Sequence, residues 1–347
     1  MEEVLAKRAS SHIKFRDLIS FLLIFTLCLF FVFGCDGTLE TFGGVVKEVK
    51  RGSNREEALS IIQDGLSDLE PQVRAQAIEV VADVRLLELM PKVQRLLKDD
   101  FVPVRFAAAV AVGDVEYYLA KETVRLLRRD PDENVRIAAS YALVRLGSSA
   151  ELGNLRKAVG SEDQTVRANA VWLIGKSDDK VSLDLLNWAR NSEDSEAKVS
   201  FQAAEAIARL GDERIYTKLW TMLISKYIDN RIMGVKAMGA LGSREAKNAL
   251  ITMLDDEVLE VRLSAAEQLG KLGYNFGEAE VVDVFTQELT SGLGEMEAEK
   301  VKVLTALAIG QIGTERLAAE LPGLLKDRSR FVRIAAAKAV LQLQKGK

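Results

Sequence analysis

Histidine and cysteine are almost absent from this chain of 347 residues. Its one histidine is His12, and its two cysteines are Cys28 and Cys35. Beyond Cys35 the sequence therefore offers no thiol pair for a disulfide, and no imidazole for metal binding or acid–base catalysis. We expect no catalytic residue, no cofactor and no metal site in this protein.

Proline is also scarce, and neither sign of charge dominates. Five prolines among residues that are 48% hydrophobic suit helices that stack without interruption. The formal net charge of −4 gives no general attraction for nucleic acid. We therefore expect no nucleic-acid partner, and nothing in the composition predicts a small-molecule substrate.

What the chain does contain is a short phrase that recurs along it: a valine, an arginine, then small apolar residues. The arginine position falls at Arg74, Arg105, Arg136, Arg167, Ser200, Arg231, Arg262, Lys302 and Arg333. Six of the eight intervals are 31 residues long, and the other two are 33 and 40. A fixed period of this size predicts one supersecondary unit stacked on copies of itself.

Each unit is expected to hold two helices. Positions −1, +3, +4 and +8 from the arginine are mostly small or apolar, which places them on one stripe of a first helix, here called the A helix. A frequent glycine at +11, such as Gly147 or Gly211, suits a left-handed residue after that helix. A second periodic stretch, such as residues 249–254, predicts a B helix. The predicted fold is an all-α solenoid, a right-handed superhelix of about nine such repeats.

An aspartate recurs six residues before the arginine. In Asp130-Pro131-Asp132-Glu133 it has the chemistry of an N-cap that precedes a first helical turn. We expect each arginine to reach such an aspartate of its own or the adjacent unit, because a merely solvated arginine would predict no period. The residues of this structural ladder are Arg74, Arg105, Arg136, Arg167, Arg231, Arg262, Arg333, Asp68, Asp99, Asp130, Asp194, Asp256 and Asp327.

The valine–arginine–alanine phrase with its upstream aspartate is similar to HEAT repeats over roughly residues 68–344. The 31-residue unit resembles the short HEAT-like units of phycobilin lyases. This resemblance implies a helical scaffold and leaves a lyase- or isomerase-type enzyme as an alternative, although a shared fold does not carry an activity. HEAT-like deoxyhypusine hydroxylases need histidine–glutamate metal sites, for which this sequence has no suitable histidine.

The beginning of the chain departs from the repeat. Four basic residues precede an uncharged, nearly apolar stretch at residues 18–33. As a helix this stretch would span about 24 Å, short of a hydrocarbon core of roughly 30 Å, which favours a signal peptide over a membrane span. Val32-Phe33-Gly34-Cys35 resembles the bacterial lipobox, and that resemblance implies cleavage before Cys35 and lipidation of its thiol.

Three parts are therefore expected. Residues 1–34 form a lipoprotein-type signal peptide or a membrane anchor, residues 35–53 a flexible tether, and residues 54–347 the repeat solenoid. The expected location is membrane-associated and extracytoplasmic, on the periplasmic side. An inner-membrane protein with an uncleaved N-terminal anchor is the alternative.

We expect the B helices to line the concave side of the solenoid and to bind a partner protein there. Early B helices carry cations, and later ones carry tryptophans that could anchor an interface. The alternatives are a solvated polar face for the cations and packing between helices for the tryptophans. The candidate contacts are Arg95, Arg125, Arg129, Arg156, Lys157, Trp188 and Trp220.

One unit is longer than the rest. The interval from Arg262 to Lys302 holds nine additional residues, which we place in a flexible loop at Thr290–Glu299 after the B helix. That loop is either a binding element or a tolerated insertion. Taken together, the sequence predicts a non-catalytic protein-interaction scaffold held on a membrane by lipid, and a module that binds anionic lipid surfaces is a further alternative.

Overall fold

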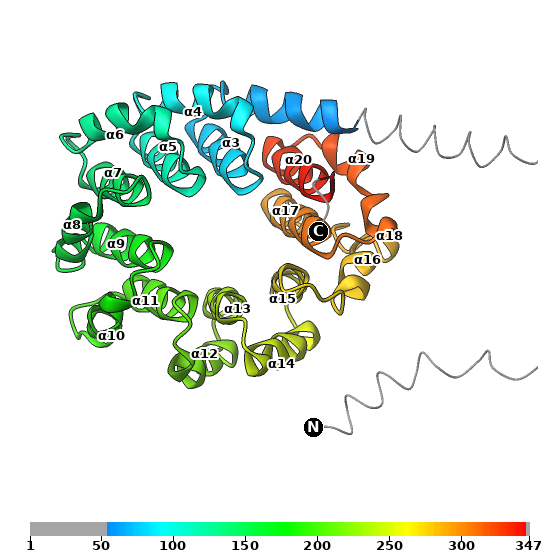
Figure 1. The fold of residues 1–347 in the computed structure, drawn as a ribbon. Helices are drawn as coiled ribbons and strands as arrows, with labels where there is room; N and C mark the ends of the chain where they lie inside the picture. The colour runs from blue at the N-terminus through cyan, green and yellow to red at the C-terminus, as the bar shows by residue number, and fades with distance from the viewer. Residues whose placement is uncertain (1–53, 345–347) are drawn as a thin grey trace, which may run out of the picture. The chain divides into compact units, whose positions relative to one another are not determined.

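The computed structural model describes residues 54–344, so the expected signal peptide, Cys35 and the tether lie outside the described part of the chain. Within residues 54–344 every regular element is a helix. Long A helices alternate with shorter B helices along the whole range (Figure 1). The all-α solenoid predicted from the repeat is therefore confirmed.

The two sets of helices follow the predicted period. The A helices are α3 (Pro71–Asp83), α5 (Val102–Val115), α7 (Glu133–Arg145), α9 (Gln164–Lys176), α11 (Ala197–Arg209), α13 (Ile228–Leu241), α15 (Leu259–Lys271), α17 (Glu295–Ile312) and α20 (Arg330–Gln344). The B helices are residues 54–65, α4 (Met90–Leu96), α6 (Lys121–Leu127), α8 (Leu152–Ala158), α10 (Leu183–Asn191), α12 (Tyr216–Leu223), α14 (Arg244–Thr252), α16 (Glu278–Thr286) and the pair α18 (Glu315–Ala318) and α19 (Leu321–Leu325).

Small residues at two positions of the A helices pack closely against two different neighbouring helices. A Cβ added at Gly234, position +3, would come within 2.9 Å of the Met222 Cβ on the preceding B helix. A Cβ added at Gly175, position +8, would lie 2.7 Å from the Ala206 Cα on the next A helix. The predicted stripe is thus buried against two neighbours, and the +8 position fixes how closely consecutive A helices approach.

A left-handed residue follows the A helix at position +11. The glycines there have positive φ angles, for example +87° at Gly147 and +80° at Gly211. Arg85, Glu116 and Asp178 occupy the same position in other units with φ of 48°, 58° and 57°. The backbone therefore keeps this turn even where the residue is not glycine, although a side chain makes the conformation less favourable.

The expectation that B helices line the concave side is wrong. Figure 1 shows the A helices from α3 to α20 on the inside of the curve and the B helices around the outside. The physical reason is the spacing: small +8 residues such as Gly113 and Gly310 bring consecutive A helices into direct backbone contact. The array therefore curves toward the A helices, and the predicted partner-binding B helices form its convex surface.

The solenoid of residues 54–344 also closes on itself, where we expected an elongated superhelix. The last A helix, α20, packs against the first, α3 (Figure 1). A Cβ added at Gly65 would lie 3.2 Å from the Ile334 Cδ1, so apolar contact reaches across the closing junction. The repeat spacing predicts stacking but not the angle between units, and that angle decides whether the ends meet.

Ion pairs reinforce the closing junction. Arg330 donates to the carboxylates of Asp68 and Glu70 at 2.6 Å each. Lys338 donates to the Asp83 carboxylate at 2.5 Å. Lys338 therefore joins the last unit to the first.

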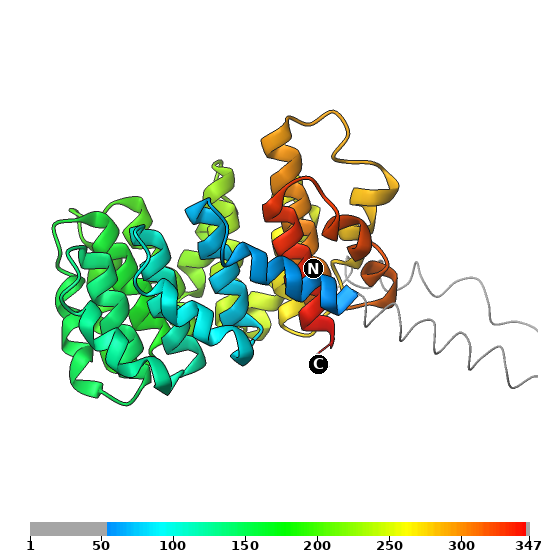
Figure 2. The same ribbon diagram turned by 90° about the horizontal axis from the view of Figure 1, so that it is seen from above.

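The additional residues of the long unit are not a simple loop. Residues 295–299, expected in a flexible segment, form the first turns of α17, which rises above its neighbours in Figure 2. At its start the Glu297 Oε2 accepts a hydrogen bond from the Gly294 amide at 3.4 Å. An acidic run beside a glycine N-cap favours helix because carboxylates complement the exposed amides of the first turn.

Candidate partner-binding site

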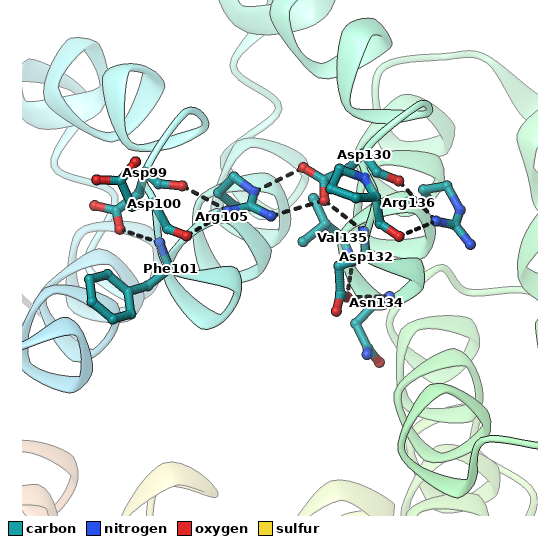
Figure 3. Close-up of polar contacts among 10 residues, drawn as sticks. Asp99, Asp100, Phe101, Arg105, Asp130, Asp132, Asn134, Val135 and Arg136 are labelled. Atoms are coloured by element: carbon teal, nitrogen blue, oxygen red, sulfur yellow. Dashed lines mark hydrogen bonds and ion pairs between the residues drawn. The ribbon is translucent and has the colours of Figure 1, made fainter.

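The loops between B and A helices carry the polar contacts that the repeat predicts. At the start of α7, the Asp130 Oδ1 accepts a hydrogen bond from the Asp132 amide at 3.0 Å, and the Asp132 Oδ1 accepts from the Asn134 amide at 2.8 Å (Figure 3). Asp132 is thus the N-cap of α7, and the prediction of Asp130 in that role is wrong. Asp130 instead closes the turn that leads to the cap, and its two oxygens also accept from an arginine.

Arg105 joins two units through one guanidinium. Its Nε and Nη2 donate to the two carboxylate oxygens of Asp130, in the next unit, at 2.8 and 3.0 Å (Figure 3). Its Nη1 donates to the backbone oxygens of Asp99 and Asp100, in the loop before its own helix, at 2.8 and 3.1 Å. All three nitrogens are therefore used, which suits the planar fork of arginine and not the single ammonium of lysine.

The same arrangement recurs along the array. The aspartate of the next unit is the partner in the pairs Arg74–Asp99 (2.8 Å), Arg105–Asp130 (2.8 Å), Arg167–Asp194 (3.1 Å), Arg231–Asp256 (2.9 Å) and Lys302–Asp327 (2.7 Å). The hydrogen bonds of these arginines within their own unit go to backbone oxygens, as in Arg74 to Asp68, Arg262 to Asp256 and Arg333 to Asp327. The ladder thus ties each loop to the loop that follows it.

The ladder pairs shift the pKa values of several of their side chains. The hydrogen bond from Arg167 lowers the pKa of Asp194, and the hydrogen bond with Asp130 raises the pKa of Arg105. Burial acts to raise the pKa of Asp327, but the hydrogen bond from Lys302 and the Ser329 amide outweigh it, so that pKa is lowered. These carboxylates therefore remain ionised at neutral pH.

Among the eight units that another unit follows, three break the pattern. Ser200 replaces the arginine, and its hydroxyl donates to the Arg190 backbone oxygen at 3.0 Å. Arg262 meets Glu280 at 3.1 Å in place of an aspartate from the next unit. At Arg136, the expected partner position holds Ser161, and the nearest carboxylate among the described residues is Glu133, 3.9 Å from the guanidinium.

A pocket of about 420 Å³ lies beside Arg136. Its walls come from the end of α6, from α7, from α8 and from the loop after α8. Arg128, Arg136 and Lys157 line it together with Glu133 and Ser161. The pocket therefore carries an excess of positive charge at the place where the ladder lacks its aspartate.

The predicted cationic contacts lie on the outer helices, and they are not equally available. Arg95, Arg129 and Lys157 are exposed. Arg125 pairs with Glu122 at 2.5 Å, while Arg156 is held by Asp179 at 2.8 Å and by the Ser182 hydroxyl at 2.9 Å. Arg156 thus acts as a link between α8 and the next unit, and only part of the predicted basic surface remains uncompensated.

The two predicted tryptophans both reach the surface. Trp188 on α10 is 48% exposed and lies under the Arg167 guanidinium, whose carbon is 5.9 Å from the ring centroid. Trp220 on α12 is 37% exposed and stacks on Tyr216 at 6.4 Å. Ile224 and Tyr227, just beyond α12, are more exposed still. The outer surface from α10 to the start of α13 therefore presents large apolar side chains to solvent.

The inner face holds a second cluster that sequence reasoning missed. A pocket of about 260 Å³ is lined by residues of α3, α5 and α9, among them Glu79, Asp83 and Asp114. Lys176 pairs with Asp114 at 2.8 Å and lies 4.8 Å from the Trp172 ring centroid. Desolvation raises the pKa of Glu79. Asp83, Asp114 and Lys176 all stand at position +9 from the arginine of their units, and this shared spacing is a signal that could have found them.

Two features are absent from the part of the chain that the structure describes. Between residues 54 and 344, no group of three or more histidine, cysteine, aspartate or glutamate side chains is placed to hold a metal ion. In the same range, no helix combines the length and apolarity needed to cross a bilayer. The predictions for Cys35 and the N-terminal segment concern residues outside this range.

Comparisons with known proteins agree with the architecture. A family model described as HEAT repeats matches residues 120–198 and 154–231. A search of curated proteins gave no match. Residues 120–231 therefore match HEAT repeats, and the fold class of residues 54–344 is the α-solenoid.

Solved structures of several helical-repeat proteins are similar to it. The complex of CpcE and CpcF of phycocyanin lyase from Nostoc sp. PCC7120 is 18% identical, with 72% of this chain and 93% of that chain covered and a TM-score of 0.44. Human deoxyhypusine hydroxylase, in complex with glycerol, is 17% identical, with coverages of 86% and 99% and a TM-score of 0.35. We draw nothing about activity from likenesses of this degree.

Proposed function

We propose that this protein is a non-catalytic scaffold that binds a partner protein through the outer surface from α10 to the start of α13. The observation that carries the proposal is the exposure of Trp188 and Trp220 on consecutive outer helices, with Ile224 and Tyr227 beside them. Large aromatic side chains are the usual anchors of protein interfaces, because they bury much apolar area with few rotatable bonds.

The proposal moves the binding surface from the concave to the convex side. The inner face carries charged groups that already pair with one another, such as Lys176 with Asp114 and Lys338 with Asp83. The exposed Trp188 and Trp220 belong to α10 and α12, which lie on the outside of the curve (Figure 1). A partner that needs apolar contact therefore finds it on the outer helices.

The location is part of the same proposal. The lipobox-like Val32-Phe33-Gly34-Cys35 supports processing at Cys35 and a lipid anchor on the extracytoplasmic side of a membrane. Mass spectrometry of the protein purified from native membranes tests this directly. A processed N-terminus at Cys35 with added acyl mass supports the anchor, whereas an intact N-terminus contradicts it.

Crosslinking in native membranes tests the binding surface. We expect one reproducible partner to crosslink to the wild type, and we expect the double substitution Trp188→Ala and Trp220→Ala to abolish that capture. Tyr118→Ala is the matched control, because Tyr118 is an aromatic residue, 59% exposed, in the turn before α6. If the control loses the partner as completely as the double variant does, the surface is wrong.

The same protein separates the alternatives. Salt-sensitive binding to anionic vesicles, lost on substitution of Arg95 and Arg129, would favour the lipid-surface module. Turnover of a bilin or another small molecule would favour the lyase-type enzyme. We expect neither, because the outer cations Arg125 and Arg156 are already paired within the chain.

A further inference from the structure

Arg136 is a ladder arginine prepared for a carboxylate that the next unit does not supply. The Nη1 of Arg136 is held by the backbone oxygens of Asp130 and Pro131 at 2.8 and 2.9 Å. The corresponding contacts of Arg105 are 2.8 and 3.1 Å. One side of the guanidinium is therefore anchored in the same way in both units (Figure 3).

The other side differs between the two units. In Arg105 the Nε and Nη2 edge carries the Asp130 carboxylate, and the arginine side chain is 12% exposed. In Arg136 the next unit offers Ser161, and the side chain is 38% exposed. A serine hydroxyl is too short and uncharged to replace a carboxylate that accepts two parallel bonds.

The space in front of that edge is a real cavity. It measures about 420 Å³, which lies within the range of roughly 300–1,000 Å³ that ligand pockets occupy. Lys157 and Arg128 add positive charge to its wall, and Ser140 and Asn154 add hydrogen-bonding groups. Glu151 offsets Arg128 at 3.2 Å, and Glu133 approaches Arg136 only to 3.9 Å. Arg136 and Lys157 are therefore the cations left for a ligand.

We propose that the pocket between α7 and α8 binds a carboxylate side chain of the partner protein, which takes the position that an aspartate of the next unit takes elsewhere in the ladder. The inference rests on the proposed scaffold function and names a second contact for it. A carboxylate is favoured over other anions because the anchored guanidinium presents the two-nitrogen edge that binds Asp130 in the preceding unit. The cavity is large enough for the residues that flank such a side chain.

Calorimetric titration of the full-length protein in detergent tests the site with defined probes. The probe is a hexapeptide of alternating aspartate and glutamate, and its control is the same peptide with asparagine and glutamine. We expect binding of the acidic peptide alone, and inorganic phosphate should compete only weakly. Equal binding of the amide peptide, or tighter binding of phosphate, would overturn the assignment.

Ser161→Asp is the decisive variant, because it supplies the missing carboxylate from within the chain. We expect it to raise the melting temperature and to weaken peptide binding at least about tenfold, since the aspartate occupies the arginine edge. Ser161→Asn, which adds a similar volume without charge, should leave both properties close to wild type. Unchanged peptide binding in Ser161→Asp would refute the proposal.

A pair of lysine and arginine variants separates the pocket from general electrostatics. Lys157→Gln removes a cation that lines the cavity, whereas Arg129→Gln removes an exposed cation of the preceding outer loop that does not. We expect only Lys157→Gln to weaken the acidic peptide, by about tenfold. Equal losses of peptide affinity in the two variants would show that net charge attracts the peptide, and would overturn the proposed site.

The two proposals fail in distinguishable ways. If the site is wrong, peptide binding fails the tests above while crosslinked capture still depends on Trp188 and Trp220. If the scaffold proposal is wrong, capture of a partner is absent or insensitive to those tryptophans. A peptide that still binds and still responds to Ser161→Asp would then show a carboxylate site without a docking role for the outer aromatic residues.

Discussion

The ordinary junctions between neighbouring units and the closing junction between α20 and α3 use different chemistry. An ordinary junction combines a backbone approach, such as Gly175 against Ala206, with a ladder pair such as Arg105–Asp130. The closing junction uses Arg330 and Lys338 instead, neither of which is a ladder position. Repetition thus specifies contacts between units that are adjacent in sequence, whereas closure depends on residues that occur once.

Disrupting the close backbone packing at an ordinary junction should cause the largest loss of stability. Gly175→Val should destabilise the protein by roughly 3 kcal/mol, because the new Cβ would meet the Ala206 backbone at 2.7 Å and helices α9 and α11 must separate. Chemical denaturation measures the loss. Gly153→Ala on α8 is the control, since open space surrounds it and alanine favours helix. Similar losses in both variants would contradict the packing argument.

Disrupting the arginine–aspartate ladder should cause the second largest loss of stability. Arg105→Ala should cost about 2 kcal/mol, because it leaves the largely buried Asp130 carboxylate without its guanidinium partner. Arg136→Ala should cost about half as much, because only backbone oxygens lose a donor there. Thermal melts of the two variants side by side give the comparison. A greater loss for Arg136 would show that the aspartate is not the important partner.

The closing junction should contribute less and should depend on pH. Arg330→Ala should cost roughly 1 kcal/mol, since its ion pairs are partly exposed. Hydrogen exchange should speed up at the start of α3 and of α20 and not at the junction of α9 with α11. Uniform acceleration through the array would show that closure is not a separate contact.

The pH dependence follows from Asp68. Burial acts to raise its pKa, but the Glu70 amide and Arg330 lower it below the ordinary value of 3.8. A carboxyl with a lowered folded-state pKa adds stability above its unfolded pKa, and that stability is lost as the pH falls through the folded pKa. The difference between wild type and Arg330→Ala should therefore be largest at neutral pH and shrink in acid. A stability difference that stays constant with pH would show that Asp68 does not contribute to it.

The smallest expected effects concern the left-handed turn shared by ordinary units. Gly211→Ala should cost about 1 kcal/mol, because a side chain disfavours φ of +80° although open space surrounds the residue. Asp178→Gly should instead stabilise by a few tenths of a kcal/mol, because aspartate tolerates this conformation better than most residues and its ion pair with Arg145 is long at 4.0 Å. Opposite signs in denaturation midpoints would support a common turn, and equal signs would contradict it.

Much of the candidate site was visible in the repeat, and part of it was hidden. The tryptophans and most of the outer cations lie on B helices, whereas Arg129 lies in the loop after α6, and all of them were placed on the wrong side of the curve. The gap at Ser161 was present in the sequence as a missing aspartate in the 31-residue register. It became a site only when the structure showed that Arg136 keeps its backbone contacts and faces a cavity.

The sequence by itself determined the helices, their order and the two faces of each A helix. These follow from local periodicity, small residues and turn chemistry, which act between residues close in the chain. Only the tertiary structure decided which helices lie inside the curve, that α20 returns to α3, and that Glu79, Asp114 and Lys176 share one pocket. Those outcomes depend on small angles between units that accumulate over the whole array, and no single repeat encodes their sum.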